Sequence, residues 1–177
     1  MRQHDYRWLL VFGGNLLLLW LAGLANHYLA AANLHLYVGG LLVTFAALRL
    51  DLKHGFTSTV LTAFAADALA PVPYGTSLVL LGLVHAVLYY GRQRFPREEV
   101  VFAIFVTLVS NLFLFLALSF LLVGRNPHPA AAWMRLFADL VFSQVVLGLA
   151  TSWFMALQEH AFALLRLHPE TGRRVAA

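Results

Sequence analysis

The sequence contains no cysteine and few charged residues, and each of these absences narrows what the chain can be. With no cysteine among 177 residues, disulfides, cysteine nucleophiles and cysteine-bound metals are excluded. Charged residues make up only 11% of the chain, although a soluble domain carries about a quarter. Hydrophobic residues make up 61%, more than a chain of this length can bury in one water-facing core. The apolar surface that such a core cannot bury should therefore face lipid. Residues 1–177 are predicted to form a single all-α membrane domain.

Motifs for catalysis and for cofactor binding are also lacking. No HExxH motif, no pair of carboxylates and no histidine cluster has the spacing of a metal site. No serine lies in a GxSxG setting, and the glycine pairs Gly13-Gly14 and Gly39-Gly40 lie within apolar stretches rather than in a phosphate-binding loop. We therefore expect no enzymatic activity, no cofactor and no metal.

Six apolar stretches are present instead, at residues 8–30, 34–50, 56–70, 76–91, 99–123 and 136–160. A helix needs about 20 residues to cross the hydrocarbon core, and tilted or packed helices depart from that length. The third stretch is short because it ends at Pro71, and the second contains Gly39-Gly40. The turn between the third and fourth stretches, from Pro71 to Gly75, suits residues that cannot continue a helix. The sequence predicts a polytopic bundle of six transmembrane helices.

Basic residues are distributed unevenly between the predicted loops. Ten of the twelve precede the first stretch, follow the sixth, or lie after the second and fourth, whereas only Arg125 and Arg135 lie on the opposite side. The positive-inside rule places the ten, and both termini, in the cytoplasm. The net charge of +4 and the pI of about 9.9 could instead indicate nucleic-acid binding. No basic run exceeds a few residues, so we expect no nucleic-acid partner.

Small residues recur at four-residue spacing on two of the stretches. Membrane helices associate by close packing and polar contacts, which such faces permit. The stripe in the third stretch contains Ser58, Thr62, Ala66 and Ala70, and the stripe in the sixth contains Gln144, Gly148, Ser152 and Ala156. Two interpretations stay open: packing inside this chain, and docking to another membrane protein.

Three polar residues inside apolar stretches need an explanation. A carboxylate such as Asp67 is costly in hydrocarbon and should face the bundle interior or a wet cavity. It could cap neighbouring backbone, relay protons or dock a partner; a relay normally needs several ionisable groups in register, which favours the other two. Asn111 and Gln144 both come within reach of the bilayer middle, so we predict a hydrogen bond between them.

One part of the chain resembles a known family. The run ALRLDLKHG at 47–55 is followed by a small-residue helix ending AADAL at 65–69, a turn with Gly75, an apolar helix at 78–90 and a basic loop. This order is similar to that of the rod shape-determining protein MreD family. The size and the six stretches agree over essentially the whole chain, and the sharp similarity covers about residues 35–100.

The resemblance implies a non-catalytic inner-membrane scaffold of the bacterial cell-elongation machinery. Such a protein would bind an MreC-like bitopic protein and help to couple MreB filaments to peptidoglycan synthases, while its basic loops would meet anionic membrane lipid. Asp67 and Gly75 are the positions of this sequence that the resemblance assigns to the family pattern. MreD-like proteins are similar in fold to the substrate-binding subunits of energy-coupling vitamin transporters, which supplies the alternative function. The first stretch lacks the AxxxA spacing expected there, and an intramembrane enzyme has the least support.

Overall fold

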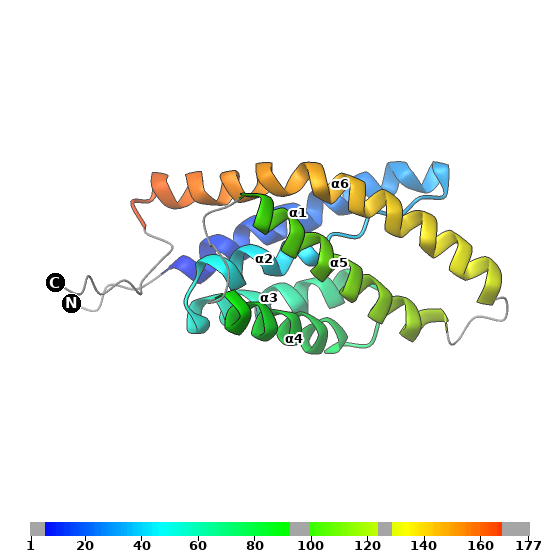
Figure 1. Ribbon diagram of the computed structural model, residues 1–177, viewed down its shortest axis with the longest axis horizontal. Helices are drawn as coiled ribbons and strands as arrows, with labels where there is room; N and C mark the ends of the chain where they lie inside the picture. The colour runs from blue at the N-terminus through cyan, green and yellow to red at the C-terminus, as the bar shows by residue number, and fades with distance from the viewer. Residues whose placement is uncertain (1–5, 93–99, 124–128, 168–177) are drawn as a thin grey trace.

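The computed structural model describes residues 6–92, 100–123 and 129–167, which are helical apart from turns and one extended segment. Figure 1 shows the helices packed into one elongated bundle. In chain order the described elements are α1 (Arg7–Leu29), the short 3₁₀ helix η1 (Ala30–Ala32), α2 (Gly39–Arg49), α3 (Leu52–Leu69), α4 (Thr76–Gly91), α5 (Val100–Val123) and α6 (Pro129–Leu164). The predicted all-α architecture is confirmed.

Three of the described helices are long and apolar enough to cross a membrane by themselves. They are α1 continued by η1, α5, and α6 from residue 132 onward. α2 and α4 are apolar but contain only 11 and 16 residues, and the 18-residue α3 is interrupted by polar side chains. The three long helices indicate a membrane protein.

Most helix boundaries follow the prediction. The stretches at 8–30, 76–91 and 99–123 agree with α1, α4 and α5 to within one residue. α3 begins earlier than residue 56 because Asp51 caps it: one carboxylate oxygen accepts from the backbone nitrogen of His54 at 3.5 Å, and the other lies 2.7 Å from its ring Nδ1. α6 extends past both ends of the predicted stretch, and it begins at a proline, which suits a first helical turn.

The prediction of one helix over 34–50 is wrong in its first part. Residues 34–38 are extended, and α2 begins only at Gly39. Asn33 adopts a left-handed φ of 54° and ends the 3₁₀ turn before them. The Gly39-Gly40 pair therefore marks the start of the helix rather than an interruption within it.

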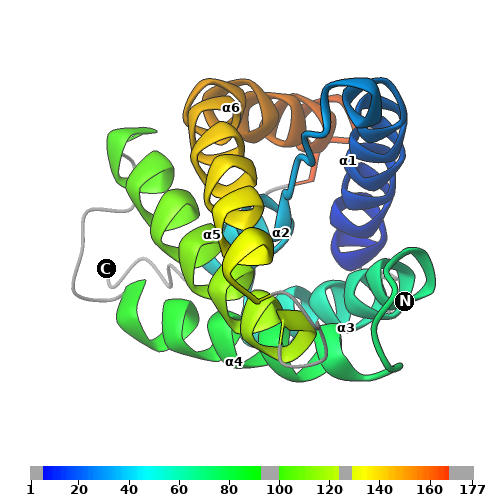
Figure 2. The same cartoon turned by 90° about the vertical axis from the view of Figure 1, so that its right-hand side faces the viewer.

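α2 forms the centre of the bundle. Every residue from Gly39 to Leu48 is buried, and the other five α-helices all contact α2. Figure 2 shows α2 deep in the bundle, behind the nearer turns of its neighbours. Gly40 allows the close approach to α5, because a Cβ at this position would overlap the backbone carbonyl of Thr107 and the backbone nitrogen of Asn111.

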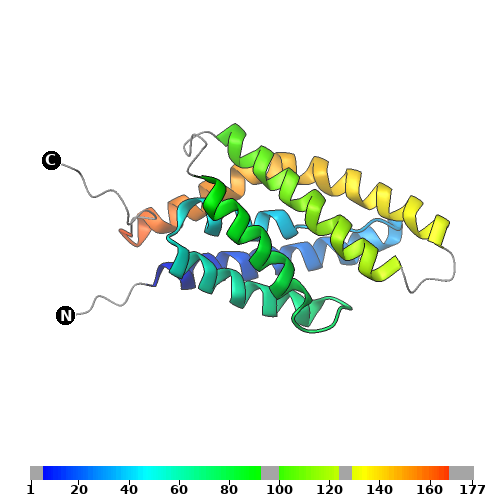
Figure 3. The same ribbon diagram turned by 60° about the horizontal axis from the view of Figure 1, so that its bottom comes forward.

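The bundle has two different ends, which we call the terminal end and the η1 end. The start of α1, the α2–α3 turn and the last turns of α4 and α6 lie at the terminal end, at the left of Figure 1. An apolar cluster joins these elements there, and it includes Val11, Phe45, Leu50, Met155 and Phe162. The η1 end carries η1, the α3–α4 turn and the last turn of α5. Figure 3 shows α5 and α6 side by side, running between the two ends.

Candidate functional site

The extended segment 34–38 and the first turn of α2 are held by side chains rather than by other backbone. Non-helical backbone at membrane depth is tolerated only where protein or water satisfies its polar groups. Four side chains of α1, α5 and α6 accept hydrogen bonds from backbone nitrogens here. The pairs are His35 to Asp139 at 2.8 Å, Leu36 to Asn26 at 2.6 Å, Tyr37 to Ser143 at 3.0 Å and Gly40 to Asn111 at 3.1 Å. These polar residues position the segment across the η1 half of the bundle.

Asp67 caps the start of the next helix. Its side chain is 2% exposed, and its two oxygens accept from the backbone nitrogens of Gly75 at 2.7 Å and Ser77 at 2.9 Å. Gly75 precedes α4 with a φ of 94°, a conformation that glycine adopts without strain. The last turn of α3 is thereby fixed to the first turn of α4. Of the three interpretations of Asp67, this geometry supports the one in which its side chain caps neighbouring backbone.

The predicted hydrogen bond between Asn111 and Gln144 is wrong. Asn111 accepts from Gly40, while Gln144 donates from its Nε2 to the backbone carbonyl of Leu108 at 3.0 Å. Asn111 Nδ2 and Gln144 Oε1 each lack a partner among the described residues. Both amides join α5 to a neighbouring element, but through backbone groups that the sequence pattern does not show.

Asn15 is a buried polar residue that the sequence analysis did not single out. It is 1% exposed, and its Nδ2 donates to the backbone carbonyl of Leu42 at 2.8 Å and to the hydroxyl of Thr62 at 3.0 Å. It therefore ties α1 to both α2 and α3. Its position as the one strongly polar residue between Trp8 and Ala25 is the signal that could have identified it.

The two stripes of small residues differ in what they contact. Ser58 and Thr62 of α3 are fully buried, and Thr62 bonds to α1, so this part of the α3 stripe serves packing within the chain. Ala66 and Ala70, nearer the η1 end, line a pocket. The α6 stripe is more accessible, and a Cβ at Gly148 would meet nothing within 4 Å.

A second polar group lies near the terminal end. His85 is fully buried, with Nδ1 2.9 Å from the hydroxyl of Thr59, and its Nε2 has no partner in the part of the chain that the structure describes. Its ring stacks on Tyr89 at 6.3 Å between centroids, and the guanidinium of Arg92 lies 4.1 Å from the centre of the Tyr89 ring. Arg92 also donates to the backbone carbonyl of Ala47 at 2.9 Å, at the end of α2. The group joins the last turns of α2 and α4.

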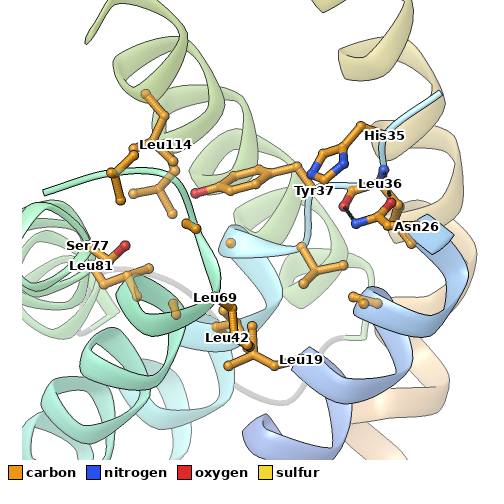
Figure 4. Close-up of a pocket in the computed structure, with 18 of the residues that line it drawn as sticks. Leu19, Asn26, His35, Leu36, Tyr37, Leu42, Leu69, Ser77, Leu81 and Leu114 are labelled. Carbon is orange, nitrogen blue, oxygen red and sulfur yellow. Dashed lines mark hydrogen bonds between the residues drawn. The ribbon is translucent and has the colours of Figure 1, made fainter. Parts of the chain in front are cut away.

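The pocket lies between α1, the extended segment, α3, α4 and α5, and its volume is about 660 Å³. This is within the range of roughly 300–1,000 Å³ that small-molecule sites occupy. Figure 4 shows aliphatic side chains around most of it, with Tyr37 extending into it from the extended segment. Among the described residues, the polar side chains in the lining are few, namely Trp20, Asn26, His35, Tyr37 and Ser77, and none is an aspartate, glutamate, lysine or arginine. The pocket can hold an uncharged, largely apolar molecule.

Within the described ranges, no group of three histidine, aspartate or glutamate residues could hold a metal ion. Comparison of the chain with protein-family models, with curated proteins and with solved structures finds no match. The functional argument therefore rests on the geometry and on the resemblance drawn from the sequence. In the described residues, the geometry offers helices fixed by internal polar contacts, an accessible small-residue stripe and an apolar pocket.

Proposed function

We propose that the chain is a non-catalytic inner-membrane scaffold of the bacterial cell-elongation machinery, as its resemblance to the MreD family implies. In this role it binds an MreC-like bitopic protein and links MreB filaments to peptidoglycan synthases. One observation carries the proposal: the described polar side chains in the interior bond mainly to the chain's own backbone. Asp67, Asn111 and Gln144 all act in this way, which suits a protein that works by contact.

The proposal includes six membrane crossings with both termini in the cytoplasm. The lengths support the least obvious crossing, the second. At 1.5 Å per helical residue and about 3.3 Å per extended residue, α2 and segment 34–38 together reach roughly 33 Å, close to the 30 Å hydrocarbon core.

The proposed orientation in the membrane rests on the distribution of basic residues between the two ends of the bundle. Described basic residues at the terminal end are Arg7, Arg49, Lys53, Arg92 and Arg166, whereas only Arg135 of the described ones lies toward the η1 end.

A partner's transmembrane helix would dock on the α6 stripe. The inner part of the α3 stripe is occupied by packing against α1, but Gly148, Ser152 and Ala156 remain at least partly accessible. The open space beside Gly148 lets a second backbone approach closely. At the terminal end, exposed Lys53 can meet anionic lipid or a cytoplasmic protein.

Co-purification from the source membranes in mild detergent tests the scaffold role. We expect the tagged chain to retain an MreC-like bitopic protein, and depletion of the chain to make rod-shaped cells round. Gly148→Leu should weaken this retention. Gly13→Leu should not, because Gly13 also has open space for a Cβ but lies on α1, away from the proposed docking stripe. Cells that keep their shape after depletion, together with a chain that retains no elongation protein, would overturn the proposal.

A substrate-binding membrane subunit of an energy-coupling vitamin transporter is the second candidate. The 660 Å³ pocket at the η1 end favours it, because such a subunit must hold a small molecule within the membrane. A vitamin that co-purifies in a one-to-one ratio would support this function over the scaffold.

A further inference from the structure

The pocket is a cleft between the diverging halves of two helices. α1 and α3 are joined where Asn15 donates to Thr62, near the middle of both helices. Beyond that bond, toward the η1 end, the pocket lies between the two helices, and its lining includes Leu19, Trp20 and Gly23 of α1 and Ala66 and Leu69 of α3. The cleft is therefore shut on the side of the terminal end and widens toward the η1 end.

The cleft opens sideways as well as toward the η1 end. Side chains on its rim are also exposed on the outside of the bundle: Trp20 of α1 is 63% exposed and Leu69 of α3 is 71% exposed. Its floor is different, because Leu42, Leu81 and Leu114 are at most 3% exposed. The gap between α1 and α3 is therefore a route by which a molecule lying in the surrounding bilayer can reach these floor residues.

The lining restricts the chemistry of the occupant. The described residues put no charged side chain in the lining, so a buried ionic group would have no partner among them, and an unpaired charge in such a site is costly. The side chain of Asn26 is already bonded in both directions to the backbone of Leu36. The other polar groups of the described lining are the indole N–H of Trp20 at the rim, the ring of His35 and the hydroxyls of Tyr37 and Ser77. Figure 4 shows the last three around a mainly aliphatic space.

From this geometry we propose that the pocket binds one acyl chain of a membrane lipid, inserted between α1 and α3 from the leaflet at the η1 end. The hydrocarbon lies against Leu42, Leu81 and Leu114, and the ester region lies near the polar groups toward the mouth. The charged headgroup stays outside the rim. This inference does not depend on the scaffold role, since a lipid could occupy the cleft whatever partner the chain binds.

Two glycines of α1 provide a matched test. A Cβ at Gly23 or at Gly13 would meet nothing within 4 Å, but only Gly23 lines the pocket. Gly23→Leu therefore adds a side chain to the cleft lining whose Cβ has open space around it, and Gly13→Leu makes the same change at an exposed position of the same helix. Ala66→Leu, on the opposite wall, is a second blocking variant.

The full chain is reconstituted in vesicles of phosphatidylethanolamine and phosphatidylglycerol with a trace of phosphatidylglycerol carrying a diazirine in the middle of one acyl chain. After illumination, we expect adducts at Leu42, Leu81 or Leu114, loss of these adducts in Gly23→Leu and Ala66→Leu, and their retention in Gly13→Leu. Circular dichroism and gel filtration verify that each variant is folded. Labelling confined to exposed residues such as Phe105 would overturn the inference. So would floor labelling that both blocking variants leave unchanged, or a tightly held non-lipid molecule that excludes the probe.

Discussion

Removal of the Asp67 side chain should separate the ends of α3 and α4. In Asp67→Ala the backbone nitrogens of Gly75 and Ser77 lose their acceptor, and the Ser77 nitrogen belongs to a residue only 8% exposed. A buried donor without a partner costs about 1–3 kcal/mol, and water at a helix end recovers part of that. We therefore expect Asp67→Ala to lower the free energy of unfolding by about 2–4 kcal/mol. Asp67→Asn, which keeps one acceptor oxygen, should lose roughly half as much.

Unfolding in mixed micelles of increasing dodecyl sulfate content, followed by circular dichroism, measures this difference. Ser77→Ala is the matched control, because it removes a hydroxyl but keeps the backbone nitrogen that Asp67 binds, and it should change stability by less than about 0.5 kcal/mol. If Asp67→Ala were as stable as the unmodified protein, the capping role would be refuted. Asp67 would then be left for a relay or for partner docking.

Two further predictions concern how the helices approach one another. Gly40→Ala should lower the free energy of unfolding by at least about 2 kcal/mol, because the new methyl group would overlap the backbone of Thr107. In the same unfolding assay, Gly148→Ala should be neutral or slightly stabilising, because a Cβ at this position has open space around it. In a double-mutant cycle, Asn15→Leu and Thr62→Val should show a coupling energy of about 0.5–1.5 kcal/mol, because their side chains share a hydrogen bond; simple additivity would argue against it.

α1, α4 and α5 were predictable because their apolar runs are uninterrupted. These three helices end within one residue of the predicted position, since hydropathy and length decide such elements. The second stretch was not predictable in the same way. Residues 34–38 are as apolar as a helical stretch, and two of the three side chains that accept from their backbone, Asp139 and Ser143, lie more than 100 residues away. Single-sequence patterns do not contain that long-range pairing.

The polar residues also differ in whether the sequence could predict their contacts. Asp67 stood out because a carboxylate in an apolar stretch must be explained, and its partners are only 8 and 10 residues away. Asn111 also stood out, but its partner was predicted wrongly because the spacing fixes depth in the bilayer, not the facing atom. The pocket had no local signal at all. It arises from the divergence of α1 and α3 beyond the Asn15–Thr62 bond, which is a property of packing.

The side of the membrane on which each end of α3 lies tests the central claim most directly, because α3 is not among the three helices that would span by length and composition. The chain has no native cysteine, so Lys53→Cys, in the first turn of α3, and Tyr74→Cys, in the turn between α3 and α4, each introduce a single thiol on opposite sides of this helix. Both positions are exposed, Tyr74 by 73%. In spheroplasts, a membrane-impermeant maleimide should label Tyr74→Cys directly and Lys53→Cys only after permeabilisation. Equal labelling of both before permeabilisation would contradict the six-span bundle.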